Sequence, residues 1–355
     1  MIYAPVKITT LSRSKHFIRL VESLKRNGWA KYTDVYVGLD FPPSEKYRRG
    51  WEKICEYIDG NDFSAFASFN VIRRTENWGA SRNSSDVTEY IRKKHDRWIS
   101  LEDDLEVSPN FIEYMDKCLD YYEKDPNVIL VSGYTYPVDW MKSNGATCML
   151  QDFSASTWGR GYWSDKAPEI ARYVVQGKML EDVGKVIEHE IYKKMIDASL
   201  REYIHAAVYP YGYKFMKNIS DMGLRAYLPI SGKYGVSPIV SKVRNHGFDG
   251  SGLYCQEISG EGDCLDARSY NYSEQPIDEQ ETFELVLNDE SYLDENRERL
   301  NRFDSRTPSE MRETRFLIWL MVHVGVWAAK LYVLFAIPYD VAKRGFAKIR
   351  RCYFK

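Results

Sequence analysis

The chain has 355 residues, of which 44% are hydrophobic and 28% charged, so it can bury the core of one large or two ordinary domains. Its formal net charge of −2 gives no general attraction to nucleic acid, and we expect no nucleic-acid partner. Its six cysteines form no CxxC or finger-like Cys/His pattern, which argues against a structural zinc site and favours reduced thiols.

Strand and helix patterns alternate along the first part of the chain. Apolar runs predict strands at residues 6–13, 34–40, 68–74, 97–101 and 127–135. Apolar residues at helical spacing predict helices between them and after them, at residues 15–28, 51–58, 81–95 and 110–125. This alternation is typical of an α/β fold with a Rossmann-like, mixed but mostly parallel sheet and helices on both faces.

Three consecutive carboxylates, Glu102, Asp103 and Asp104, follow the fourth predicted strand in the sequence WISLEDDLEVSPNF. Ligands of such sheets bind beyond the carboxyl ends of the strands, and Arg13 and Asp40 stand near the ends of the first two. Adjacent like charges repel, so a divalent cation with oxygen ligands is the natural compensator. The alternative is an acidic turn that favours the dipole of the following helix.

The stretch LEDDLEVSPNFIEY resembles the metal-binding segment of the N-acetylglucosaminyltransferase I family and of related bacterial glycosyltransferases with the GT-A fold. Five other segments resemble motifs of these proteins in the same order: LSRS at 11–14, VGLD at 37–40, ENWGASRN at 76–83, SASTWGRGYW at 154–163 and RNHGFDGSG at 244–252. The similarity covers about residues 5–255. It implies a GT-A fold and a transferase that uses a nucleotide sugar, with a UDP-sugar expected as the donor.

The same resemblance implies roles for individual residues. Asp104 would ligate Mn²⁺ or Mg²⁺. Glu102 and Asp103 would hold the nucleotide ribose or the donor sugar, Arg13 and Asp40 would contact the uridine base, and Arg82 would lie near the diphosphate. The metal would neutralise the charge that develops on the leaving nucleoside diphosphate.

A catalytic base is expected later in the chain, because an inverting displacement needs a group that takes the proton of the acceptor hydroxyl. Asp182 and His205 are the main candidates, and Asp197 is a further one. His246 is either an extra metal or phosphate contact or an ordinary loop histidine. The glycine-rich residues 246–252 predict a closing lid, with a plain surface turn as the alternative.

The C-terminal part is apolar and then basic. Residues 316–337 hold only His323 and Lys330 as strongly polar groups, and a helix of about 22 residues would span roughly 33 Å, enough for a bilayer. A basic amphipathic helix is predicted after it. A full span would carry this basic tail to the far side, so we expect peripheral or monotopic association with the cytoplasmic leaflet of the inner (plasma) membrane. A buried packing helix or a homodimer interface is the alternative.

These patterns predict three parts: a catalytic domain at 1–255, an acidic connector with a helix at 256–311, and membrane-associating helices at 312–355. Together with the resemblance, which implies an inverting reaction, they favour a metal-dependent inverting glycosyltransferase that extends a lipid-linked glycan in bacterial surface polysaccharide biosynthesis. A nucleotidyltransferase on a similar sheet is the alternative. It would usually carry a glycine-rich phosphate loop after the first strand, where this chain has LSRSKHFIRL without glycine.

Overall fold

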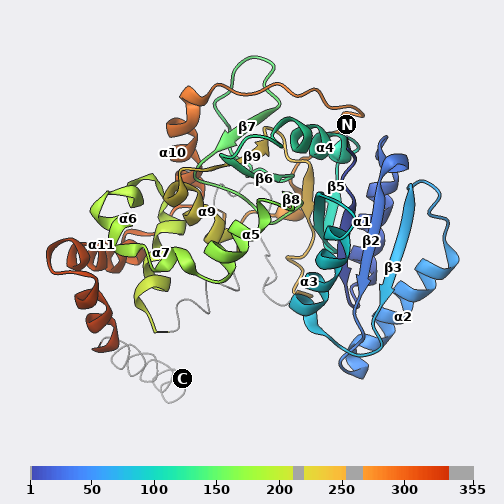
Figure 1. Ribbon diagram of the computed structural model, residues 1–355, viewed down its shortest axis with the longest axis horizontal. Coiled ribbons are helices and arrows are strands. Elements are labelled where there is room, and N and C mark those ends of the chain that lie inside the picture. The colour runs from blue at the N-terminus through green and yellow to red at the C-terminus, as the bar shows by residue number, and fades with distance from the viewer. Residues whose placement is uncertain (1, 211–219, 253–266, 336–355) are drawn as a thin grey trace, which may run out of the picture. The chain divides into compact units, whose positions relative to one another are not determined.

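The computed structural model describes residues 2–210, 220–252 and 267–335 and divides the chain into two compact units (Figure 1). The first unit comprises Met1–Glu169 and Lys233–Phe303, and the second comprises Ile170–Gly232 and Asp304–Lys355. The boundaries expected at residues 255 and 311 differ from this division. Residues 170–232 were expected in the catalytic domain, but they pack with the C-terminal helices.

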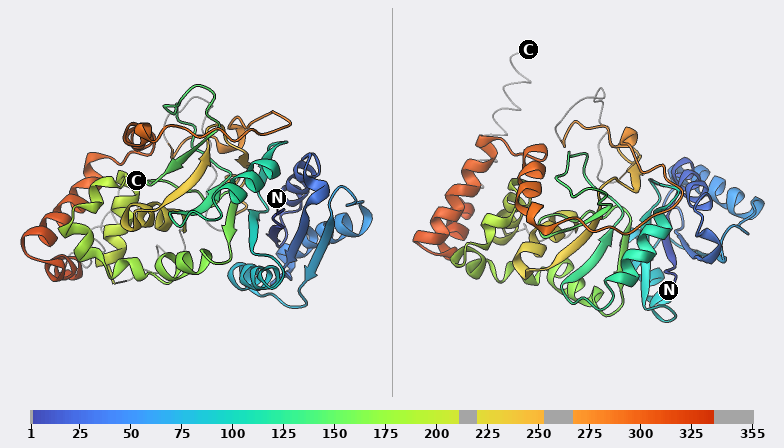
Figure 2. Two further views of the ribbon diagram at one scale, coloured as in Figure 1. Left: turned by 45° about the horizontal axis from the view of Figure 1, so that its top comes forward. Right: turned by 90° about the horizontal axis from the view of Figure 1, so that it is seen from above.

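An eight-stranded mixed sheet forms the centre of the first unit, in the order β3-β2-β1-β4-β8-β6-β9-β7 (Figures 1 and 2). The strands are β1 (Val6–Thr10), β2 (Asp34–Leu39), β3 (Ser68–Arg73), β4 (Arg97–Glu102), β6 (Val128–Ser132), β7 (Cys148–Gln151), β8 (Arg160–Trp163) and β9 (Tyr234–Pro238). Neighbours from β3 to β4 are parallel, as are β6 and β9. β8 is antiparallel to β4 and β6, and β7 is antiparallel to β9.

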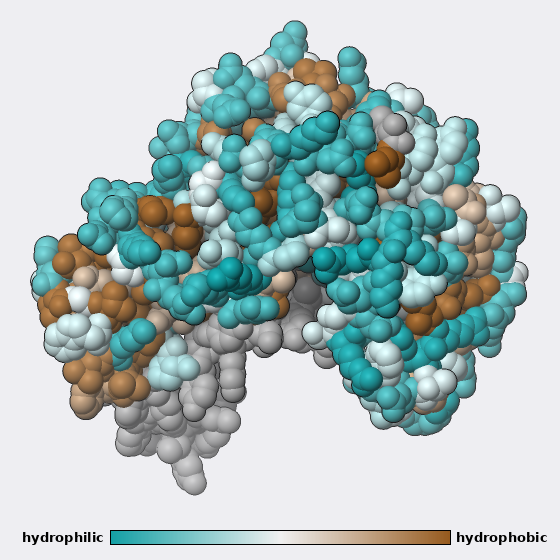
Figure 3. Space-filling model, viewed as in Figure 1, coloured by the Kyte–Doolittle hydropathy of each residue, from teal (hydrophilic) through white to brown (hydrophobic). Residues whose placement is uncertain are grey.

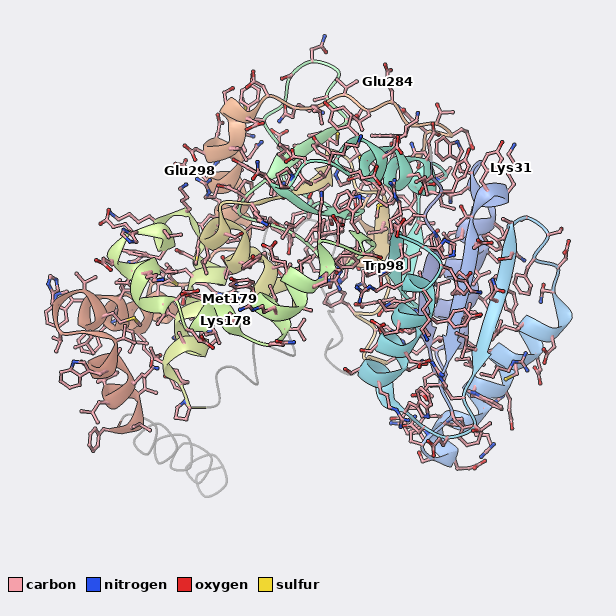
Figure 4. The ribbon with its side chains drawn as sticks, in the orientation of Figure 1. Lys31, Trp98, Lys178, Met179, Glu284 and Glu298 are labelled. Carbon is pink, nitrogen blue, oxygen red and sulfur yellow. The ribbon has the colours of Figure 1, made fainter. Side chains whose placement is uncertain are left out.

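Helices cover both faces of this sheet, as the sequence predicts. Apolar side chains of α1 (Ser14–Lys25), α2 (Glu45–Gly60) and α4 (Phe111–Tyr121) form the larger core with one face, which includes Val6 and Ile8. On the other face α3 (Gly79–Arg92) packs Val87 against Tyr36 and Trp98, which is labelled in Figure 4. The fully buried strands read as continuous apolar runs, which is why their positions were predictable.

A separate two-stranded ribbon pairs β5 (Leu105–Val107) with β10 (Val243–Asn245) in antiparallel register. The sequence predicts no strand at either place. β5 begins directly after the turn at residues 103–104, and Asn245 lies opposite Leu105. This pairing brings the glycine-rich segment to the acidic triplet.

The expected connector does not form a separate part where it is described. Its described elements are the short 3-10 helices η5 (Tyr272–Glu274) and η6 (Glu290–Tyr292), followed by α10 (Leu293–Phe303). Another 3-10 helix, η1 (Ala30–Tyr32), lies earlier in the chain and precedes β2. Gln275 donates to the carbonyl of Thr135 at 2.8 Å, and the Phe283 N–H donates to Glu113 at 3.1 Å. Residues 267–303 therefore belong to the first unit.

The second unit is helical in its described parts. α5 (Ala167–Ile170) ends at the first residue of this unit. The elements that follow in the unit are η2 (Ala171–Val175), η3 (Lys178–Leu180), α6 (Val183–Glu188), η4 (Ile191–Lys194), α7 (Asp197–Val208), α9 (Ser220–Ser231) and α11 (Pro308–His323). Tyr203 of α7 donates to the carbonyl of Met179, which is labelled in Figure 4. Buried Arg225 of α9 pairs with buried Asp304 at 2.7 Å, which joins the two chain segments of the unit.

The apolar C-terminal stretch is interrupted. α11 begins with a capping box between Thr307 and Glu310 and ends at His323, and Gly325 follows with φ +121° before helical residues 326–335. The single helix expected over 316–337 is therefore wrong in its described part. No described helix has the length and apolar character that crossing a membrane requires. The predicted basic amphipathic helix lies in 336–355, outside the described residues.

Candidate active site

The acidic triplet lies at the carboxyl end of β4, beside the carboxyl end of β1. Strand pairing puts Thr9 opposite Glu102, the last residue of β4. Glu102 is exposed, whereas Asp103 and Asp104, in the turn that follows, are each only 5% exposed. Two adjacent carboxylates in a buried turn need compensation, because burial and mutual repulsion both disfavour their charge.

Arg13, which lies between β1 and α1, supplies part of that compensation. Its Nη1 donates to Oδ2 of Asp104 at 2.8 Å, and its Nη2 donates to Oδ1 of Asp103. The other oxygen of Asp103 accepts from Thr10 Oγ1 at 2.8 Å. Burial raises the pKa of Asp103, although the positive charge of Arg13 opposes the shift. In this structure Arg13 and both oxygens of Asp103 contact protein groups, and their expected nucleotide contacts stay predictions.

Asp104 has one oxygen left. Among the residues that the structure describes, buried Oδ1 of Asp104 has no hydrogen-bond partner. A buried carboxylate oxygen without a partner is costly. No described group of three or more His, Cys, Asp or Glu side chains could hold a metal. The unpartnered Oδ1 of Asp104 would fit a cation that takes one carboxylate oxygen from the protein and others from substrate phosphates and water, as Mg²⁺ usually does.

Gly247 closes the site on the side of Oδ2. A Cβ at this position would lie 2.2 Å from that oxygen, so only glycine allows the close approach. The Gly247 N–H donates to the side chain of Asn245 at 2.6 Å, and the backbone N–H of His246 donates to the carbonyl of Asp104 at 2.8 Å. The end of β10 thus holds the glycine-rich segment against the acidic turn.

The rest of this segment is fixed to α1. His16 Nε2 lies 3.0 Å from Oδ2 of Asp249, and Ser251 donates to Oδ1 of the same carboxylate through its hydroxyl at 2.6 Å and its N–H at 2.9 Å. Partial burial raises the pKa of Asp249, but the bonds from Ser251 and His16 outweigh it and lower that pKa to about 2. We call the His16–Asp249 contact the latch. Movement of the segment as a lid stays a prediction.

His246 contacts a carboxylate of the neighbouring strand β5. Its Nε2 lies 2.8 Å from Glu106 on β5, and this bond lowers the pKa of Glu106. Arg244 also approaches Glu106, at 3.6 Å. The imidazole therefore supports the β5–β10 ribbon next to the acidic turn. A contact from His246 to metal or phosphate stays a prediction.

Asp40 is a buried anchor at the end of β2. Its carboxylate accepts from the N–H groups of Phe41, Trp78 and Gly79 at 2.8–2.9 Å and from the side chain of Asn77 at 3.2 Å. It therefore satisfies donors at the start of α3, where negative charge is favourable. Sequence reasoning placed Asp40 correctly at a strand end but missed this structural task. Its contact with a nucleotide base stays a prediction.

Arg82 of α3 belongs to a stack with Trp78 and Arg74, which precede this helix. Its guanidinium carbon lies 3.9 Å from the centre of the Trp78 ring, and that of Arg74 lies 3.9 Å from the same ring. Arg74 is tied to Asp86 at 2.6 Å, whereas the Arg82 side chain is 62% exposed. The expected diphosphate contact of Arg82 stays a prediction.

The candidate bases lie in the second unit. Asp182 precedes α6, is partly exposed and lies 3.9 Å from Lys185, and Asp197 begins α7. His205 on α7 is 3.5 Å from Thr314 and 3.9 Å from Glu313 on α11. Burial lowers the pKa of His205 to about 4, with the charge of Arg201 helping and that of Glu313 opposing.

Comparison with known proteins gives structural likenesses only. No protein-family model matches the chain, and no curated protein matches its sequence. The structural neighbours are glycosyltransferases. They include S. aureus TarS (12% identity, TM-score 0.34, covering 48% of this chain and 30% of that one) and its residues 1–349 with UDP-GlcNAc (13%, 0.34, 48% and 48%). The mannosyltransferase PcManGT from Pyrobaculum calidifontis with GDP-Man and Mn²⁺ is another (12%, 0.32, 48% and 46%).

These neighbours are longer than the part that is similar to this chain. This chain spans less than half the length of each of the three. At these TM-scores and identities, the likeness does not assign the chain to a family.

Proposed function

We propose that the chain is a metal-dependent, inverting glycosyltransferase that moves a sugar from a UDP-sugar to a hydroxyl of a lipid-linked glycan for a bacterial surface polysaccharide. One observation carries the proposal: the buried pair Asp103 and Asp104 at the end of β4, with Oδ1 of Asp104 left without a partner among the described residues. A site with this charge and this free oxygen suits a divalent cation that accompanies a diphosphate.

The surrounding residues support this use of Asp104. Arg13 holds Oδ2 and Thr10 holds Asp103, which leaves Oδ1 of Asp104 as the carboxylate oxygen of this pair without a described hydrogen-bond partner. Gly247 leaves no room on the Oδ2 side. A metal bound at Oδ1 would supply positive charge for the departing nucleoside diphosphate. Exposed Glu102 at the same strand end remains the proposed contact for the ribose or donor sugar.

The proposed base takes the proton from the acceptor hydroxyl. A histidine with a pKa of about 4 is neutral at pH 7 and can accept a proton. Its basicity resembles that of an ordinary Asp carboxylate, whose pKa is about 4. Asp182 and His205 therefore both remain candidates, with Asp197 behind them.

The proposed acceptor follows from the apolar surface of the second unit. Trp319 of α11 is 51% exposed, and Trp327 and Phe335 beyond Gly325 are 64% and 73% exposed. Figure 3 shows hydrophobic side chains gathered over α11. The sequence continues with basic residues Lys343, Arg344, Lys348, Arg350, Arg351 and Lys355. Exposed tryptophans followed by cations suit an anionic leaflet, so we propose peripheral or monotopic binding to the cytoplasmic face of the inner membrane.

Binding of nucleotide sugars tests the proposal. Calorimetry with UDP-GlcNAc, UDP-glucose, UDP-galactose and GDP-mannose, each with Mn²⁺ and with EDTA, should show metal-dependent binding of at least one UDP-sugar. If EDTA leaves the binding unchanged, the proposed metal dependence is contradicted. If none of a wider set of nucleotide sugars binds, the glycosyltransferase proposal is wrong. Release of pyrophosphate from a nucleoside triphosphate would instead indicate the nucleotidyltransferase.

A further inference from the structure

A basic hollow lies beside the turn between β1 and α1, within the first unit. Its volume is about 460 Å³, and its lining includes Ser12, Ser14, Lys46, Arg49, Gly50 and Lys53. Arg13, between the two serines, directs its guanidinium to Asp103 and Asp104 instead. The hollow is therefore distinct from the acidic site, although one short turn contributes to both.

Three cations of α2 share one side of this hollow. Lys46, Arg49 and Lys53 are spaced by three and four residues, so they lie on one face of the helix. Within the described chain, none of the three forms an ion pair with a carboxylate, whereas neighbouring Arg48 pairs with Glu45 at 3.1 Å. Gathering three positive charges without an acidic partner is unfavourable, and a bound anion would offset the repulsion.

The opposite side offers hydrogen-bond donors suited to an anion. Ser12 and Ser14 contribute hydroxyl groups, and Ser14 is the first residue of α1. The first turn of this twelve-residue helix carries no acidic side chain of its own. The lining of the hollow thus combines two hydroxyl groups with three cations and includes no carboxylate.

Gly50 fixes the two sides relative to each other. A Cβ on Gly50 would lie 2.0 Å from the carbonyl oxygen of Ser12, so α2 and the turn are in direct backbone contact. The backbone of α2 that carries the cations is therefore held at a defined distance from the turn that carries the serines. A prearranged site loses less entropy when a ligand binds.

We propose that this basic hollow binds a phosphoryl group, separate from the diphosphate that the Asp104 site would handle. The inference rests on the proposed function in one respect: in a transferase for lipid-linked glycans, the phosphoryl group would belong to the diphosphate of the acceptor. The same chemistry is present in free phosphate and pyrophosphate and in the nucleotide, and the experiment separates these sources.

The test compares a double variant, Arg49→Gln with Lys53→Gln, with the matched control Arg48→Gln on the same helix. Glutamine is a good helix former, so both proteins should fold, which circular dichroism and thermal melting verify. Calorimetry with inorganic pyrophosphate in EDTA measures the hollow without any metal at Asp104. We expect wild type and Arg48→Gln to bind, and the double variant to bind about tenfold or more weakly, because two charge-assisted contacts are lost.

Further measurements identify the source of the phosphoryl group. With a sugar linked to a short prenyl diphosphate as acceptor, the KM of the double variant for this acceptor should be about fivefold or more above that of wild type. Its kcat should stay near the wild-type value. Binding of UDP with Mn²⁺ should not change. Inorganic phosphate should compete with pyrophosphate and lose its effect in the double variant.

Two outcomes would overturn the inference. One is equal pyrophosphate binding by wild type and the double variant, or none by either. The other is a loss of UDP binding in the double variant as large as the loss of pyrophosphate binding, which would assign the hollow to the donor nucleotide. Because the pyrophosphate measurement needs no sugar transfer, failure of the glycosyltransferase proposal would appear separately, as absent transfer with intact pyrophosphate binding.

Discussion

Gly247 approaches Asp104 so closely that a methyl group on its Cα would lie 2.2 Å from Oδ2 of the carboxylate and 2.9 Å from its Cγ. The contact exists because β10 pairs with β5, which directly follows the acidic turn. The backbone of the glycine-rich segment thus forms one wall of the proposed metal and nucleotide site.

Gly247→Ala should displace the Asp104 carboxylate or the glycine-rich segment, because the methyl group cannot fit. We expect a loss of stability of about 1–3 kcal/mol and a large fall in metal-dependent UDP binding. Thermal unfolding and calorimetry measure the two effects. Gly28→Ala is the control, since nothing lies within 4 Å of a Cβ there. Normal UDP binding by Gly247→Ala would mean that the wall does not shape the site.

Asp104→Asn should abolish metal-dependent nucleotide binding and lower transfer by about 100-fold or more, since the charge on the proposed ligand is lost. The amide oxygen can still accept from Arg13, and Asp103 retains its own bond to that guanidinium, so the fold should survive. Transfer assays and melting curves check both expectations. The exposed substitution Asp62→Asn is the control. Full activity of Asp104→Asn, or of wild type in excess EDTA, would remove the metal from the proposal.

Asp249, held by Ser251 and by the latch to His16, should make stability depend on pH at the acidic end. The pKa of Asp249 is lowered to about 2 in the folded protein, below the ordinary value of about 3.9. The folded state therefore gains stability that is present above pH 4 and lost as the pH falls toward 2. Melting temperatures between pH 5 and 2 should fall less steeply for Asp249→Asn than for wild type. Parallel curves for the two proteins would show that the carboxylate does not contribute.

Inversion by a single base predicts that one substitution among three will stop turnover. Asp182→Asn, Asp197→Asn and His205→Gln should be compared with His189→Gln, an exposed residue near the end of α6. Only one of the first three should lose about 100-fold or more in kcat with unchanged UDP binding. Near-normal rates for all three would exclude these residues as the base. A product with retained anomeric configuration would exclude direct displacement.

Membrane association should depend on the exposed aromatic residues of α11 and of the helical residues that follow it. Leu317 and Met321 of this helix are buried, so deletion from residue 312 would damage the second unit. Replacing Trp319 and Trp327 by Gln, or ending the chain after residue 335, is a safer change. Each should reduce sedimentation with vesicles that contain anionic lipid, as should high salt for the basic tail.

The control for this experiment is Tyr121→Gln, which removes a residue that is 60% exposed on α4 of the first unit. If both altered proteins sediment with vesicles as well as wild type does, the proposed binding to the cytoplasmic leaflet is contradicted. A change from dimer to monomer in the Trp variants, with no vesicle binding by wild type, would indicate that the apolar surface joins two copies of the chain.

The parts of the fold that were predictable have local signals. β1, β2, β4 and β6 are apolar runs bounded by turns, so the sequence locates them and the carboxylates that follow β4. β5 and β10 have only three residues each and are stabilised by pairing across a long stretch of chain, which no local pattern reveals. The interruption at Gly325 did have a signal, because glycine within an apolar run weakens a helix.

The site shows the same division. A strand-end position is a property of the sequence pattern, and the position of Asp104 follows from it. The partners of a side chain depend on tertiary contacts, so the bonds of Arg13 to the two aspartates and of Asp40 to the start of α3 were not foreseeable. The glycine-rich segment was recognisable as unusual, but its contact with Oδ2 of Asp104 required β10.

The Arg225–Asp304 pair has a consequence for biosynthesis. Residue 225 leaves the ribosome long before residue 304, because the whole return of the chain through β9, β10 and α10 is translated between them. During that interval the guanidinium lacks the carboxylate it meets in the finished protein, and a buried charge without its partner is costly. The helical unit can therefore complete its interior only once residue 304 has been translated, when all the strands of the sheet have already been made.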